Sequence, residues 1–288
     1  MSTTTTQTAI SKISTTQDAS YIPRGPVTTS LSFFKAPADG STPFYYVETP
    51  PQGQPKFNYS EEFHRVQMND IRGRESDFNL EIDAFQAISN VASAEQDFTE
   101  DEHIKQTYYP EVEKLLLENV AGAHKVVLFD HTIRRSSPNA ARAPVTRTHV
   151  DQTARSTEWR VRLHSPDEAD ELLKGRYRII NVWRPLNGPV QGHPLGFASA
   201  RSVDDTDLIG VEHRYPHRTG ETASVRFNPG QEFYYWSGMT NEERLFLKCF
   251  DSQEGVGQRV PHTAFVDPRT PEGARGRESI EVRALVYG

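Results

Sequence analysis

The second half of the chain alternates between short stretches dense in apolar and aromatic residues and short stretches of turn-forming residues. Runs rich in Val, Ile, Phe and Tyr that end at Gly, Pro, Asn or Asp are typical of β-strands. The predicted strands lie in HKVVLFDHTIRRS, RYRIINVWRP, DLIGVEHRY, ETASVRFN, QEFYYWSG, RLFLKCFDS, HTAFVD and RESIEVRALVY. TNEER at 240–244 resembles a capping box, so we expect one helical turn before the strand in RLFLKCFDS. Many short strands beside few helices predict a mainly β fold with flanking helices, a sandwich or jelly roll.

Two segments carry helical patterns. In YPEVEKLLLENV, 109–120, apolar residues recur along one face, and Pro110 suits the first helical position. A second helix is predicted to begin with Ser165 as its N-cap and Pro166 as its first residue, and to end at Gly175. We therefore expect a pair of helices before most of the strands.

The chain has 288 residues, a length that single all-β domains often reach. Residues 1–25 are rich in Ser and Thr and poor in large apolar groups, so we expect a disordered tail. Residues 26–288 are predicted to form one domain. Within it, the Pro-rich stretch 26–105 is expected to be a wrapping or lid segment and 106–288 the β core.

The charge pattern excludes several classes of partner. The net charge is −7 without a basic stripe, which argues against binding to nucleic acid or to an anionic membrane surface. No apolar stretch approaches the roughly 18 residues of a membrane span, and the N-terminus lacks the apolar segment of a secretory signal. The single cysteine, Cys249, fits a buried thiol in a reducing compartment. A cytoplasmic protein with a small-molecule partner is expected, and the sequence leaves its oligomeric state open.

The stretch THVDQT, 148–153, offers two metal ligands. In an extended chain residues i and i+2 point the same way, so His149 and Asp151 can converge on one ion. A distal histidine on a late strand, His262, is the economical third ligand. Two histidines and one carboxylate leave three positions open on Fe(II) for O2 and a chelating co-substrate. On these residues alone, a polar pair on an exposed strand stays an open alternative.

The last predicted strand offers a receptor for a carboxylate. Alternation places Arg277 and Ser279 on one face, and a guanidinium beside a hydroxyl suits a carboxylate in a partly dry pocket. Arg283 shares that face, so it either replaces Arg277 or pairs with Glu281. In NVWRP, Trp183 is expected in the core, and its neighbours Asn181 and Arg184 are candidate pocket residues.

These segments together resemble a known family. THVDQT, IINVWRPLNGPV, FYYWSGMTNEERLFLKCFDS, PHTAF and RESIEVRALVY look like the non-haem iron, 2-oxoglutarate-dependent oxygenases that include gibberellin desaturase, an aspergillic-acid hydroxylase and a bacterial cephamycin methoxylation protein. The resemblance covers about residues 108–288. It implies a cupin-like double-stranded β-helix that holds iron through residues matching His149, Asp151 and His262. It also implies that Arg277 and Ser279 grip the far carboxylate of 2-oxoglutarate, with Arg283 as the competing arginine.

The function that the resemblance implies is oxidation of a small specialised metabolite, or of its amino-acid or terpenoid precursor. Fe(II), 2-oxoglutarate and O2 would be required, and C–H abstraction would lead to hydroxylation, desaturation or oxidative cyclisation. Two alternatives stay open at this point. One is a β-helix module that binds a metabolite without catalysis, and the other is an iron oxidase that uses the same triad without 2-oxoglutarate.

Overall fold

A computed structural model describes residues 19–136 and 142–288. Of the predicted tail, residues 1–18 lie outside the described residues. The remainder, 19–25, contacts the domain: the Gln191 side chain donates to the carbonyls of Ala19 and Tyr21, and Arg24 donates to the Ser237 carbonyl. None of the helices in the described ranges is both long and apolar enough to cross a bilayer.

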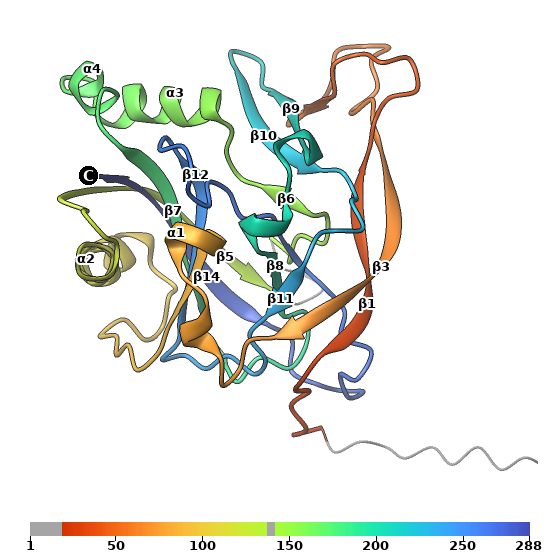
Figure 1. Cartoon of the computed structure of the whole chain (residues 1–288), viewed down its shortest axis with the longest axis vertical. Helices are drawn as coiled ribbons and strands as arrows, with labels where there is room; N and C mark the ends of the chain where they lie inside the picture. Colours follow the sequence, from red (N-terminus) through yellow and green to blue (C-terminus); the bar gives the residue numbers. More distant parts are fainter. Residues whose placement is uncertain (1–18, 137–141) are drawn as a thin grey trace, which may run out of the picture.

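Two sheets form the body of the molecule (Figure 1). The nine-stranded sheet has the order β1 (Val27–Lys35), β3 (Ser60–Asp70), β11 (Phe233–Tyr235), β8 (Leu195–Ala198), β13 (His262–Ala264), β6 (His149–Val150), β10 (Thr219–Val225), β9 (Leu208–Arg214) and β2 (Phe44–Tyr46). The five-stranded sheet has the order β4 (Phe85–Ile88), β12 (Arg244–Asp251), β7 (Tyr177–Pro185), β14 (Glu278–Tyr287) and β5 (Lys125–Arg135). Nearly all neighbours are antiparallel, and strands distant in sequence lie side by side. This is the jelly roll that the strand pattern predicted.

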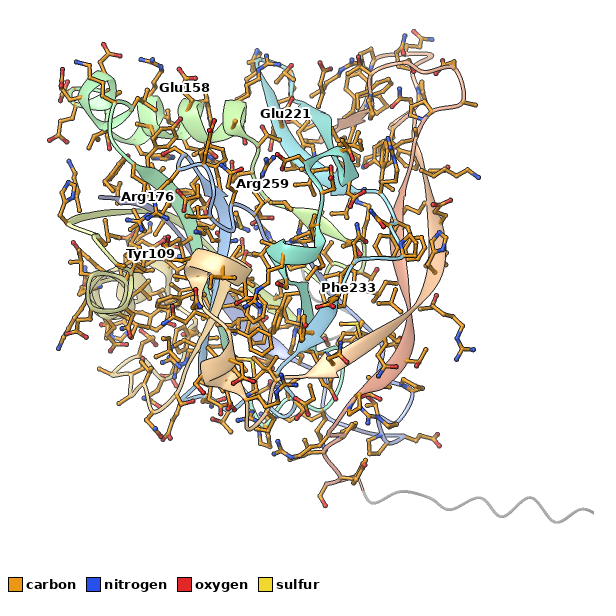
Figure 2. All side chains as sticks on the ribbon, in the orientation of Figure 1. Tyr109, Glu158, Arg176, Glu221, Phe233 and Arg259 are labelled. Carbon is orange, nitrogen blue, oxygen red and sulfur yellow. The ribbon has the colours of Figure 1, made fainter. Side chains whose placement is uncertain are left out.

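Alternation along β14 divides its residues between two cores. Ile280, Val282, Ala284 and Val286 face outward and pack on the long helix α2 (Asp101–Asn119), which covers the five-stranded sheet. Leu285 faces inward with Ile179 of β7 and meets Val150 of β6 between the sheets. Tyr109 of α2 and Phe233 of β11 accordingly lie on opposite sides of the five-stranded sheet (Figure 2). The odd-numbered residues from 277 to 283 are thereby directed to the space between the sheets.

The first predicted helix is longer than the sequence suggested. Helix α2 begins at Asp101, eight residues before the predicted start, so Pro110 lies inside the helix and the prediction of Pro110 as its first residue was wrong. Ile104, Tyr108, Val112 and Leu116 recur every four residues and are all buried. The free energy gained by burying this stripe on the sheet offsets the loss of the backbone hydrogen bond that Pro110 cannot donate.

The second predicted helix, from Ser165 to Gly175, was also wrong in its bounds. An 11-residue helix that the sequence analysis missed, α3 (Ala154–His164), comes first, and Ser165 is its C-cap rather than an N-cap. Only one turn, α4 (Ala169–Leu172), forms within the predicted range. Thr153 begins α3 through a capping box with Ser156. The THVDQT stretch therefore runs directly into a helix.

The remaining short elements connect the strands. They are α1 (Leu80–Asp83) and the 3-10 helices η1 (Glu75–Asp77), η2 (Ala200–Ser202) and η3 (Asp205–Asp207). The helical turn expected at 240–244 is wrong: Thr240 donates its N–H to the Glu243 carboxylate, but the chain makes a hydrogen-bonded turn and enters β12 at Arg244. Segment 26–105, expected as a wrapping or lid segment, supplies edge strands to both sheets, and the expected boundary at 106 falls inside α2.

A buried ion cluster closes one end of the five-stranded sheet. The Lys248 ammonium and the Asp251 carboxylate are both fully buried and 2.7 Å apart, and Arg176 also donates to Asp251. We expect Asp251→Ala to lower the free energy of unfolding by about 3–5 kcal/mol, because Lys248 would keep a buried charge without its counter-ion. Urea unfolding measures this loss. Asp205→Ala removes an exposed partner of Arg259 and serves as control, and an equal loss in both variants would contradict the prediction.

Candidate metal centre

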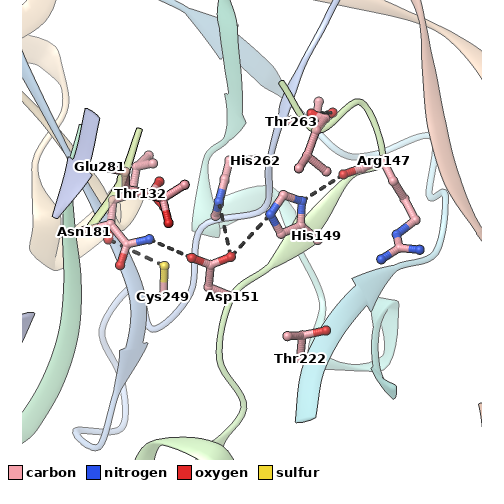
Figure 3. Close-up of polar contacts among 12 residues, drawn as sticks. Thr132, Arg147, His149, Asp151, Asn181, Thr222, Cys249, His262, Thr263 and Glu281 are labelled. Carbon is pink, nitrogen blue, oxygen red and sulfur yellow. Dashed lines mark hydrogen bonds and ion pairs between the residues drawn. The ribbon is translucent and has the colours of Figure 1, made fainter. Parts of the chain in front are cut away.

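The β-sheet brings together three residues that are distant in the sequence. Strands β6 and β13 pair antiparallel with His149 opposite His262, and Asp151 follows β6 by one residue. One potential ligand atom from each of these three residues lies within 4.8 Å of the other two. Figure 3 shows both imidazoles and the carboxylate pointing to one space between the strands. The sequence-predicted triad is thus a cluster in the folded chain.

Backbone carbonyls fix both imidazoles in the orientation that a metal requires. His149 Nδ1 lies 2.8 Å from the Arg147 carbonyl oxygen, and His262 Nδ1 lies 3.1 Å from that of Val260. Since a carbonyl can only accept, both Nδ1 atoms must carry the proton, which leaves each Nε2 with a free lone pair. These two Nε2 atoms lie 3.3 Å (His149) and 4.0 Å (His262) from Asp151 Oδ1.

The second oxygen of Asp151 is held from the opposite sheet. Asn181 Nδ2 donates to Asp151 Oδ2 at 2.9 Å, and Arg283 Nε donates to the same atom at 3.0 Å. Burial by itself would raise the pKa of this carboxyl, but the charge of Arg283 brings the pKa well below its ordinary value. Asp151 is therefore ionised at neutral pH, with one oxygen fixed and the other free to bind a cation.

The donor set fits a divalent transition metal. Two ligands roughly 2.1 Å from an ion and at right angles to each other lie roughly 3 Å apart. The 3.3 Å between His149 Nε2 and Asp151 Oδ1 is near this value, and the 4.0 Å between His262 Nε2 and Asp151 Oδ1 is longer. Burial, followed by the nearby His149, lowers the pKa of His262, so that imidazole is in the neutral form that binds metals. Two imidazoles and one carboxylate on one face of the ion are the arrangement typical of non-haem Fe(II).

A pocket adjoins the triad on the side of the five-stranded sheet. Its walls include the triad, Trp183 and, from the inner face of β14 and the residue before it, Arg277, Ser279 and Glu281. Arg277 is 2 % exposed and lies with its guanidinium 5.3 Å from the Trp183 ring centroid. It donates to the His193 carbonyl, and no carboxylate among the described residues pairs with it. Burial, with Arg134 adding to the effect, lowers the pKa of Arg277 to about 9.

Arg277 and Arg283, the two candidate receptors for the carboxylate of 2-oxoglutarate, have different environments. Arg283 forms ion pairs with three carboxylates, those of Asp151, Asp130 and Glu281. Arg277 keeps a buried Nε without a partner in the pocket. Burying a cation without a counter-ion costs free energy. We therefore expect an anion to bind beside Arg277 rather than beside Arg283.

Other sequence candidates were partly correct. Asn181 faces the site, whereas Arg184 points to the outer core and stacks on Phe98 and Tyr108. Trp183, expected in the core, is buried but also lines the pocket. Cys249 is buried between the sheets, as predicted.

Glu281 and Thr132 are among the pocket residues that sequence reasoning missed. Glu281 follows Ser279 by two residues on the inner face of β14, and Thr132 lies opposite Glu281 on β5. Extending the alternation argument by one step would have found Glu281. Thr132 depends on strand register, for which the sequence carries no signal.

The chain matches known proteins over almost its whole length. A family described as "Oxidoreductase/YMDC permease-like domain" matches residues 31–287. The hydroxylase/desaturase poxK of Penicillium oxalicum is 35 % identical over an alignment of 302 residues that covers 92 % of each chain. The Fe(II)/2-oxoglutarate-dependent dioxygenase nvfI of Aspergillus novofumigatus is 30 % identical over 266 residues, covering 90 % of this chain and 95 % of the relative.

The fold comparison agrees with the sequence comparison. A solved structure of the iron and alpha-ketoglutarate-dependent endoperoxidase NvfI superposes with a TM-score of 0.83 at 28 % identity, covering 92 % of this chain and 99 % of that one. The resemblance that the sequence suggested is therefore confirmed, as is the double-stranded β-helix fold that it implied. This chain belongs to the family of Fe(II)- and 2-oxoglutarate-dependent oxygenases that contains these hydroxylase/desaturases.

Proposed function

We propose that this dioxygenase holds Fe(II) through His149, Asp151 and His262. The observation that carries the proposal is the convergence of His149 Nε2, His262 Nε2 and Asp151 Oδ1, with every other polar atom of these side chains already committed to a partner. Imidazoles fixed in this way lose little conformational freedom when an ion binds. Three ligands on one face leave room for a chelating co-substrate and O2.

In this proposal Arg277 and Ser279 bind the far carboxylate of 2-oxoglutarate. Both line the pocket that adjoins the triad, and Arg277 lacks a protein carboxylate. A dicarboxylate entering this pocket gives Arg277 its counter-ion and reaches toward the triad with its other end. Arg134, which lines the same pocket and donates to the Ala143 carbonyl, adds a second positive charge that favours an anion there.

Arg283 and Asn181 act as positioning residues. They hold Asp151 Oδ2 so that Oδ1 faces the two imidazoles, and they keep the carboxylate ionised in a buried place. When bound, iron with 2-oxoglutarate and O2 supplies an oxidant able to break a substrate C–H bond. The protein residues orient the reactants and exclude water around that reaction.

The substrate that we propose is a small specialised metabolite or its precursor. Relatives that match over most of this chain bear the names hydroxylase/desaturase and endoperoxidase, so related chains are named for different oxidations. The outcome depends on which substrate carbon lies nearest to the ion and on how the substrate radical is held. Hydroxylation, desaturation and oxidative cyclisation all start from the same hydrogen abstraction.

Removing the arginine that orients Asp151 is expected to weaken metal binding. Arg283→Gln deletes the charge beside Asp151 Oδ2, and we expect Fe(II) affinity to fall about 10- to 100-fold, as for other groups that orient a metal ligand. The measurement is anaerobic titration with Fe(II). Arg135→Gln, on an arginine of β5 that pairs with the half-exposed Glu278, is the control. Unchanged iron affinity in Arg283→Gln would contradict the positioning role.

The proposed function is tested by the fate of 2-oxoglutarate. Extracts or panels of amino acids, peptides, terpenoids and alkaloids are incubated with the enzyme, Fe(II), 2-oxoglutarate and O2, and succinate is quantified. Release of succinate that rises with one class of compound and disappears without Fe(II) supports the proposal. Oxidation of a compound without succinate release would instead indicate an iron oxidase that does not use 2-oxoglutarate.

A further inference from the structure

A second hollow is lined by Asp151, one residue of the candidate metal centre. We call it the α3 hollow. Its walls are the first half of α3, with Ser156, Trp159 and Arg160, and the hairpin of β9 and β10, with Tyr215, Arg218 and Thr222. Asp151 lines both this hollow and the pocket of Arg277. Figure 2 shows Glu158 of α3 and Glu221 of β10 at the same end of the molecule.

Two arginines in the α3 hollow have no counter-ion within the described residues. No carboxylate of that part of the chain forms an ion pair with Arg160, whose side chain makes a long contact of 3.5 Å with His164. Arg218, on the exposed hairpin, likewise has no ion pair within the described ranges. Among the nearby carboxylates, Asp130 pairs with Arg283 and Glu158 with Arg162, while Glu221, which itself lines the hollow, accepts a hydrogen bond from the Thr153 hydroxyl.

Aromatic rings hold these two guanidinium groups in place. The Arg160 guanidinium lies 5.0 Å from the Phe129 ring centroid and 5.3 Å from that of Trp159. Arg218 lies over the same Trp159 ring at 5.3 Å and over Tyr215 at 3.8 Å. Burial lowers the pKa of Arg160, the effect expected for a cation partly withdrawn from water. Stacking on rings orients a guanidinium but leaves its N–H donors free for an anion.

Trp159 gives the hollow an apolar surface beside these cations. The side chain is 40 % exposed although it lies between two arginines and above a cavity. An exposed indole in a concave site is a favourable surface for an apolar carbon skeleton. The hollow therefore combines an anion receptor, an apolar wall and direct access to a candidate iron ligand.

We propose that the α3 hollow is the substrate site and that the substrate is an organic carboxylate. Its carboxyl group binds between Arg160 and Arg218, and its apolar skeleton lies along Trp159 with the carbon to be oxidised near Asp151. This inference rests on the proposed function, because it takes the His149, Asp151 and His262 cluster as the reaction centre. It assigns the substrate and 2-oxoglutarate to two hollows that are both lined by Asp151.

Isothermal titration calorimetry with matched acids and amides tests the proposal. The full chain is loaded with Fe(II) and saturating 2-oxoglutarate under argon, so that the Arg277 pocket is filled and no turnover occurs. The probes are trans-cinnamate and indole-3-acetate, each compared with its neutral amide. We expect each acid to bind at least about tenfold more tightly than its amide, a difference of about 1.4 kcal/mol.

Variants locate the anion receptor. Arg160→Gln is expected to raise the Kd of the acids about tenfold and to leave the amides unchanged, and Arg218→Gln to have a smaller effect in the same direction. Arg162→Gln removes the same charge from α3 at a residue paired with Glu158 and Asp170, and should change nothing. Unchanged amide binding in the variants shows that the hollow is still folded.

Three results would overturn the inference. They are equal binding of acid and amide, no binding of either acid, and an equal loss of acid affinity in Arg162→Gln and Arg160→Gln. Failure of the proposed function would be seen separately, since 2-oxoglutarate itself would then not bind in the loading step. If 2-oxoglutarate binds and the acids show no preference over the amides, the assignment of the α3 hollow to an organic carboxylate is wrong and the proposed function stands.

Discussion

His262→Ala is expected to abolish turnover and to leave the fold in place. The imidazole supplies one of three ligands, and within the described ranges no histidine besides His149 and His262 belongs to this cluster. Loss of a group that merely orients a ligand costs about 10- to 100-fold in metal affinity, so loss of the ligand itself should cost more than about 100-fold. Succinate release with 2-oxoglutarate, Fe(II) and O2 measures turnover, and anaerobic Fe(II) titration measures binding.

The control for His262→Ala is His217→Ala, which removes an exposed histidine from the β9–β10 hairpin. Thermal unfolding without metal separates loss of iron from loss of fold, since His262 is 3 % exposed and its removal leaves a small cavity. Full turnover in a folded His262→Ala variant would remove His262 from the metal site. Restored turnover of the variant with added imidazole would instead support the ligand assignment.

The second large effect is expected at Arg277. Arg277→Ala removes the buried cation that we assign to the far carboxylate of 2-oxoglutarate, and truncating one partner of a buried ion pair costs about 2–5 kcal/mol. The KM for 2-oxoglutarate should therefore rise at least roughly 30-fold, the lower end of that range. Fe(II) affinity should stay near its original value, because Arg277 does not contact Asp151, His149 or His262.

Arg283→Ala provides the decisive comparison with Arg277→Ala. Arg283 is tied to Asp151, so its loss should lower Fe(II) affinity first and change the KM for 2-oxoglutarate only at subsaturating iron. Arg277→Lys keeps the charge but not the fork of donors and should restore part of the affinity. If the KM for 2-oxoglutarate rises in Arg283→Ala and not in Arg277→Ala, the carboxylate receptor has been assigned to the wrong arginine.

Local patterns predicted most strands of the second half of the chain, but β1, β2, β3, β4 and β8 were not predicted. The triad was inferred from the spacing of His149 and Asp151 together with the family resemblance. The period-two spacing of His149 and Asp151, and of Arg277 and Ser279, fixes which side chains share a face, because successive residues of a strand point to opposite sides. The helices were predicted less well. The stripe of α2 continues through Tyr108 and Ile104 before Pro110, and packing on the sheet outweighs the proline. Helix α3 was not predicted because its polar composition is typical of a loop. The tertiary contacts of the buried Val161, which the sequence does not show, stabilise it as a helix.

The sequence alone could not predict the different roles of Arg277 and Arg283. Arg277 and Arg283 lie on the same face of one strand, so alternation treats them alike. Their difference comes from what the neighbouring strands place beside them. Register pairs Arg283 with Asn181 on β7 and with Asp130 on β5, next to Asp151, whereas Arg277 meets a carbonyl and an indole. Long-range register depends on how all the strands pack, and a single amino-acid sequence does not show it.

The sequence by itself thus determined the fold class, and spacing within single strands indicated that His149 and Asp151 share one face and that Arg277 and Ser279 share another. Only the tertiary structure decided that His149 lies opposite His262, that Arg283 serves Asp151, and that Arg160 and Arg218 share a ring at a second hollow. These facts join segments far apart in the chain. Their physical origin is the packing of the two sheets against each other, which local spacing does not encode.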